Sequence, residues 1–141
     1  MLKKIISIGL ATAALAFTLP ALAATTTANT GAVIACVGSA VNTRESAIDT
    51  AIQTHEQAVQ AAYTTRATAL QQAYQNTTAA TVKTAVKAAW SAFSGSVKNA
   101  ASAWRASRNT AWSTFRAAVK TCKAPSSVTD SGNASMEASG Q

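Results

Sequence analysis

The chain has 141 residues, with 12 Lys and Arg against 5 Asp and Glu, 1 His, 2 Cys and a formal net charge of +7. A chain of this length is expected to form one domain. A single histidine and two cysteines leave no His cluster, no zinc-ligand spacing and no catalytic triad, so we expect no catalytic residues, no metal site, no cofactor and no enzymatic activity.

The first 23 residues have the three parts of a secretory signal peptide. Residues 1–4 (MLKK) are basic, residues 5–19 are apolar, and Pro20 precedes a small-x-small cleavage site at residues 21–23 (ALA). The apolar run is shorter than the roughly 20 residues that a membrane-spanning helix needs. We therefore expect cleavage after residue 23 and export to the periplasm or cell surface, where disulfides form.

Composition divides the rest of the chain into three segments. Residues 24–35 begin with ATTTANTGA and are expected to form a flexible linker. Residues 124–141 are rich in Ser, Gly and Asn and carry a helix stop at Pro125, which predicts a disordered tail. Residues 36–123 are rich in alanine, the best helix former, and are expected to hold the folded part.

Residues 36–123 contain eleven-residue repeats. VGSAVNTRESA, IDTAIQTHEQA, VQAAYTTRATA and LQQAYQNTTAA follow one another from Val37, and a second set begins at Val82. Eleven residues fill three helical turns at about 3.67 residues per turn, close to the 3.6 of an α-helix. The period of two that is typical of strands is absent. The repeats predict two long helices, over about residues 37–76 and 82–122.

A turn is predicted between the two sets of repeats. Residues 76–81 have N-cap chemistry, the repeat slips by one position there, and residue 79 is the midpoint between Cys36 and Cys122. Folding back at this point predicts an all-α, antiparallel two-helix hairpin of coiled-coil type, with arms of roughly 60 Å. The two cysteines then meet and close the hairpin with a disulfide. Two free thiols or an intermolecular bridge is the alternative.

The hairpin has an approximate register, good to about one turn. Antiparallel pairing is expected to place Tyr63 opposite Gly95 and to bring Asp49 near Arg108 as a cross-arm ion pair. Three aromatic residues lie at the centre of the apolar stripe and are expected in the core: Phe93, Trp104 and Phe115.

Charge is concentrated on the second arm, which carries several Lys and Arg and no acid. On the eleven-residue wheel these cations form one edge, and two tryptophans lie between that edge and the apolar stripe. The candidate anion-binding residues are Lys87, Lys98, Arg105, Arg116, Lys120, Trp90 and Trp112. Such an edge suits an anionic envelope polymer, a membrane surface or nucleic acid. The alternative is a solvated face that keeps an Ala-rich rod soluble, with both tryptophans covering the seam between the arms.

Two further functions compete with binding of an anionic partner. The first is a structural role, in which the thin hairpin self-associates into a homo-oligomeric helical bundle. The second is ice binding, because a stripe on the first arm resembles that of alanine-rich helical antifreeze proteins: Thr43, Ala47, Ala51, Thr54, Ala58, Ala62, Thr65, Ala69 and Ala73. His55 shares a repeat position with Arg44 and Arg66 and is expected to be a polar interface residue rather than a metal ligand.

Residues 35–123 resemble a group of small secreted proteins from ultra-small bacteria of candidate phyla such as Parcubacteria. The resemblance is carried by Ala35-Cys36-Val37, Arg44-Glu45, Arg66 with Ala69-Leu70, and the ending from Phe115 to Cys122-Lys123. It implies secretion and a disulfide-closed hairpin, and it implies no established biochemistry.

Overall fold

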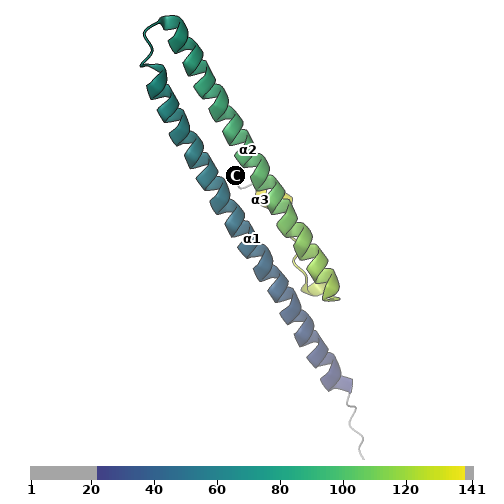
Figure 1. Cartoon of the computed structure of the whole chain (residues 1–141). Coiled ribbons are helices and arrows are strands. Elements are labelled where there is room, and N and C mark those ends of the chain that lie inside the picture. The colour runs from purple at the N-terminus through teal and green to yellow at the C-terminus, as the bar shows by residue number, and fades with distance from the viewer. Residues whose placement is uncertain (1–21, 139–141) are drawn as a thin grey trace, which may run out of the picture.

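The computed structural model describes residues 22–138. Within this range the chain is helical and has no strand. Helices α1 (Leu22–Ala73) and α2 (Ala79–Thr121) run antiparallel, and the short 3₁₀ helix η1 (Ser126–Val128) and helix α3 (Ala134–Ala138) follow (Figure 1). The predicted all-α hairpin is confirmed. Most of the predicted signal peptide (residues 1–21) lies outside the described residues.

The two long helices follow from composition. Neither contains a proline, and alanine occurs throughout both. With 52 residues in α1 and 43 in α2, the rods are about 78 and 64 Å long. Several threonine hydroxyls donate to the carbonyl four residues earlier, as Thr54 does to Thr50 at 2.8 Å. These polar side chains are therefore satisfied within their own helix.

The turn lies where it was predicted. The side-chain amide of Asn76 donates to the carbonyl oxygen of Ala73 at 2.8 Å, which satisfies a carbonyl at the end of α1. Thr78 is the N-cap of α2, and its hydroxyl accepts a hydrogen bond from the backbone N–H of Thr81 at 3.3 Å. One side-chain cap on each side thus sets where the chain reverses.

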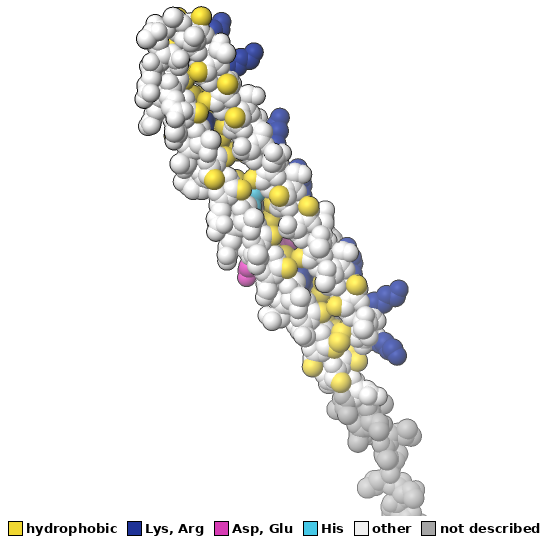
Figure 2. Space-filling model, in the orientation of Figure 1, with side chains coloured by type: hydrophobic (Ala, Val, Ile, Leu, Met, Phe, Trp, Pro, Cys, Tyr) yellow, Lys and Arg dark blue, Asp and Glu magenta, His cyan; other side chains and the backbone are white. Residues whose placement is uncertain are grey.

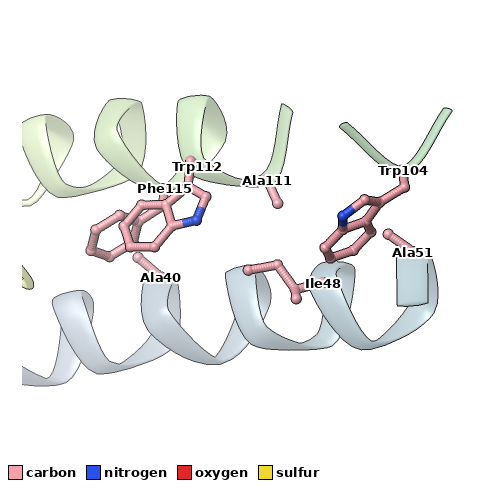
Figure 3. Packing of buried hydrophobic residues seen from close by; sticks show 7 residues of the cluster. All are labelled: Ala40, Ile48, Ala51, Trp104, Ala111, Trp112 and Phe115. Carbon is pink, nitrogen blue, oxygen red and sulfur yellow. The ribbon is translucent and has the colours of Figure 1, made fainter. Parts of the chain in front are cut away.

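The buried aromatic side chains of the seam between the two helices come from α2 and pack against mainly smaller aliphatic ones of α1. Near the disulfide end, the cluster consists of Trp104, Ala111, Trp112 and Phe115 from α2 with Ala40, Ile48 and Ala51 from α1 (Figure 3). Trp104 and Phe115 are buried as predicted, and Phe93 is half-buried. No large side chain among the described residues is less than 2% exposed, because two helices cannot surround a side chain on every side.

The predicted disulfide closes the base of the hairpin. Cys36 in α1 is bonded to Cys122, the C-cap of α2, and their Cα atoms are 5.8 Å apart. The bond joins positions separated by 86 residues. Closing a loop of this length contributes about 4–5 kcal/mol to stability in the chain-entropy description.

α1 begins earlier than predicted. Residues 24–35 are helical, where a flexible linker was expected, because alanines recur among the threonines and no proline occurs between Leu22 and Ala73. No helix among residues 22–138 is long and apolar enough to cross a membrane.

The tail, which we define as residues 124–138, also differs from the prediction. Lys123 has a φ of 55°, the left-handed conformation common just after a helix, and the chain then turns back along α2 (Figure 1). Ala134 packs against the core cluster. The described part of the segment predicted to be disordered is thus docked on the hairpin.

The register is close to the predicted one, but both predicted contacts are wrong. Tyr63 packs edge-on against Phe93, with ring centroids 4.9 Å apart, and a Cβ built on Gly95 would have no neighbour within 4 Å. Arg108 is buried and donates to the side chain of Asn109 at 3.3 Å, and it makes no ion pair with Asp49. The repeat predicts which face of each helix lies at the interface, whereas side-chain rotamers determine the individual contacts on that face.

Candidate functional site

Exposed cations line the outer edge of α2. We call this set the basic row: Lys83, Lys87, Lys98, Arg105, Arg116 and Lys120. All six side chains are exposed, and none forms an ion pair with another described residue. Figure 2 shows Lys and Arg side chains projecting along this edge for most of the length of α2. The predicted basic edge therefore exists as a solvent-facing row of spaced cations.

Trp112 does not line the basic row, contrary to the prediction. It is only 4% exposed, and the guanidinium carbon of Arg44 lies 4.1 Å from the centre of its ring. The same guanidinium lies 4.5 Å from the ring centre of Phe115. Arg44 thus stacks on two aromatic rings of α2, a cation–π arrangement that buries its charge.

The tail covers Arg44 and Trp112 with two carboxylates. An oxygen of Asp130 lies 2.8 Å from Nη1 of Arg44, and the indole Nε1–H of Trp112 donates to Glu137 at 2.8 Å. Gly132 lies so close that an added Cβ would be 3.1 Å from a ring carbon of Trp112. Since the tail holds Trp112 from outside the hairpin, a wheel of α2 alone could not place this side chain correctly.

Charges at this contact shift two pKa values. Burial by itself would lower the pKa of Arg44, but hydrogen bonds and charge from Glu45 and Asp130 outweigh it and raise the pKa. The pKa of Asp130 is lowered, first by a hydrogen bond from the backbone N–H of Gly132 and then by Arg44. Both shifts favour the charged forms, so the ion pair persists at neutral pH.

A second cluster of an arginine with aromatic rings lies nearer the turn. We call it the Arg66 cluster, which consists of Tyr63, Arg66, Trp90 and Phe93. The guanidinium carbon of Arg66 lies 4.8, 4.5 and 4.4 Å from the ring centres of Tyr63, Trp90 and Phe93 respectively. Trp90 is 49% exposed, and Nε of Arg66 is buried without a hydrogen-bond partner. Trp90 therefore belongs to this cluster as well as flanking the basic row.

His55 and Arg108 occupy the seam between these two clusters. The ring of His55 lies 6.5 Å from that of Trp104, a tilted contact typical of an interface residue. Arg108 is 7% exposed, and its Nε has no hydrogen-bond partner. Residues 22–138 contain no group of three or more His, Cys, Asp or Glu that could hold a metal ion.

The Thr/Ala stripe of α1 lies at the edge of the seam. Ala51, Ala62 and Ala73 are buried, while Thr43, Thr54 and Thr65 are exposed and border hollows between the helices. The largest of these hollows measures about 400 Å³ and is lined mainly by Ala, Ser and Thr of both helices. Figure 2 shows small apolar groups following this seam. The stripe is thus only partly available to an ice surface.

Sequence reasoning found the basic row but missed both arginine clusters. The sequence did contain a pattern that could have predicted these clusters. Arg44, His55 and Arg66 share one repeat position, and aromatic residues recur at the same spacing on the second arm. The anchoring carboxylates of the tail had no such signal.

Comparison with known proteins gave no match to a family model, a curated protein or a solved structure. The function of the chain is therefore argued from the geometry of these sites.

Proposed function

We propose that this chain is a secreted, non-enzymatic protein that binds an extended anionic polymer along the basic row. The observation that carries the proposal is the row of six exposed cations without an acidic partner among the described residues. From Lys83 to Lys120 it spans about 55 Å of helix. A straight row of this length matches a linear polyanion better than a compact ligand.

The side chains around the basic row favour a polymer over a membrane surface. A helix that binds a membrane surface needs an apolar face beside its cations. Apart from Trp90, the exposed residues interspersed with the cations are mainly small and polar: Ser91, Ser94, Ser102, Asn109 and Ser113. Trp112, which would have supplied an apolar anchor, is held beneath the tail.

Salt dependence and a matched pair of variants test the proposal. Binding to polyphosphate, DNA and vesicles rich in anionic lipid is measured over a range of salt concentrations. Each cation that contacts a phosphate should steepen the slope of log affinity against log salt by about 0.7–0.9. The double variant K98Q/R105Q lacks two cationic contacts and, at low salt, should bind about tenfold more weakly than the parent chain.

The control changes net charge equally but elsewhere. Q53E/Q57E adds two negative charges on exposed positions of α1 and should retain most of the affinity. Equal losses in the two double variants, or binding that ignores salt, would overturn the proposal. Binding to vesicles but not to polymers would show that the ligand of the basic row is a membrane surface and would overturn the proposed polymer ligand.

Self-association is a second candidate, favoured by the hollows along the seam. A second hairpin could fill them, because Ala, Ser and Thr allow close approach of helices. Sedimentation at increasing protein concentration tests this candidate, with Thr110→Arg as the variant because Thr110 lines the hollow of about 400 Å³ between the two helices. Dimer formation by the parent chain that Thr110→Arg abolishes is the supporting outcome, and a monomer at all concentrations refutes it.

A further inference from the structure

The two arginine clusters are related by the eleven-residue repeat. Arg44 and Arg66 are two repeats apart on α1, and on the antiparallel α2 the pairs Trp112/Trp90 and Phe115/Phe93 are separated by the same two repeats. The ring contacts agree, because each guanidinium lies 4.1–4.5 Å from the Trp and Phe ring centres of its own cluster. The hairpin therefore contains the same binding geometry twice.

Within residues 22–138, only the first of these clusters holds carboxylates. Arg44 pairs with Glu45 and Asp130, and Trp112 donates to Glu137. At the Arg66 cluster the position following the arginine is Ala67, and no described acid pairs with Arg66. Exposure shows the same difference, since Trp112 is 4% exposed and Trp90 is 49% exposed.

The chain's own tail cannot serve both clusters. Arg66 lies thirty residues beyond Cys36 along α1, about 45 Å from the disulfide. Asp130 follows Cys122 by only eight residues, which reach at most about 29 Å when fully extended. Glu137 could reach Arg66 only by leaving Trp112, so while the tail is docked a carboxylate at Arg66 comes from another molecule.

We propose that the Arg66 cluster is a binding site for an acidic peptide segment, with one carboxylate on the guanidinium of Arg66 and a second acceptor on the indole N–H of Trp90. The docked tail defines the ligand chemistry. It carries two carboxylates seven residues apart and a glycine that allows the backbone to lie against the indole ring. A charge-assisted hydrogen bond to a half-buried guanidinium supplies the polar part of the recognition. The site does not depend on polymer binding by the basic row.

A peptide of residues 124–138 added to the full-length protein is the probe. The indole N–H signals of the three tryptophans are followed by NMR and assigned with Trp90→Phe. The peptide should shift the Trp90 signal in a saturable way and leave that of Trp104 unchanged. A peptide with Asn and Gln in place of the two acids should bind about tenfold more weakly, the loss expected for a charged hydrogen bond. This comparison leaves the folded protein untouched.

Two protein variants distinguish specific binding at Arg66 from non-specific attraction of the acidic peptide to the positively charged protein. Arg66→Gln should weaken peptide binding about tenfold, whereas Lys98→Gln, which removes an equal charge from the basic row, should change it less than about twofold. Equal effects of the two variants, equal binding of the acidic and neutral peptides, or a silent Trp90 signal would overturn the proposal. Loss of polymer binding in K98Q/R105Q with peptide binding intact would show that the two sites are separate.

Discussion

The guanidinium of Arg44 and the carboxylate of Asp130 are 2.8 Å apart, although one lies in the first helix and the other in the tail beyond the second. This ion pair joins the tail to the face of the hairpin where Arg44 stacks on Trp112 and Phe115. It sits beside the hydrogen bond from Trp112 to Glu137, so the tail is held at two points.

Acid should release the tail. The pKa of Asp130 is lower in the folded protein than its ordinary value near 3.9, so its contribution to docking is complete above that value and is lost as pH falls through the lowered pKa. We expect Trp112 to become accessible to a fluorescence quencher below about pH 4. Asp130→Asn should increase this accessibility already at pH 7. Ser131→Ala, a neighbouring exposed residue, is the control, and an equal effect in both variants would contradict the role of the ion pair.

Removing Trp112 should cost more stability than removing Trp90. Trp112→Ala deletes a 4% exposed side chain and should lower the free energy of unfolding by about 3–5 kcal/mol, the range for large-to-small changes in a core. Trp90→Ala deletes a side chain that is 49% exposed and should cost less than half as much. Urea unfolding of the oxidised proteins measures both. Equal losses would mean that the tail does not cover Trp112 in solution.

Two glycines should respond to alanine in opposite ways. Gly95 lies inside α2 with nothing within 4 Å of an added Cβ, so Gly95→Ala should raise stability by about 0.5–1 kcal/mol. At Gly132 the added Cβ would be 3.0 Å from Asp130 and 3.1 Å from Trp112. Gly132→Ala should therefore loosen the tail and expose Trp112 to quencher while leaving helix content unchanged. Thermal unfolding and quenching together check the pair, and a destabilised Gly95→Ala would place the glycine in a tighter environment than described.

Reducing the disulfide should lower the free energy of unfolding by about 4–5 kcal/mol, because the unfolded chain regains the freedom of a long loop. Denaturant unfolding of the oxidised chain and of the Cys36→Ser/Cys122→Ser variant measures the difference. Non-reducing peptide mapping confirms the bond in the first sample. A difference near zero would mean that the helices already restrict the unfolded ensemble.

Much of the fold was predictable because the repeat is long and regular. Its period gave two helices, and the break at residues 76–81 together with the midpoint between the cysteines gave the turn and the disulfide. The start of α1 was not predictable from composition, since Thr-rich sequence also suits a linker, but alanines and the absence of proline let the helix continue.

The candidate sites were only partly predictable. Whether a cation of α2 is exposed follows from its position on the helical wheel, which local sequence determines. All five cations predicted to be exposed are exposed. The environment of Trp112 depends on Asp130, Gly132 and Glu137, which lie in a segment whose Ser, Gly and Asn content is typical of disorder. A few anchoring side chains can order such a segment without changing its average composition, and no periodicity marks them.

The covalent link at the base has one more consequence for this repetitive chain. If one helix slid past the other by a whole repeat, apolar positions would again face apolar positions, so packing alone separates such shifted alignments poorly. The bond between Cys36 and Cys122 adds to the capped turn in holding a single alignment, since a shift by even one repeat would carry the two sulfurs about 16 Å apart. Disulfide formation thereby favours one helix register over several of similar packing energy. The register in turn determines which aromatic rings of α2 each arginine of α1 contacts.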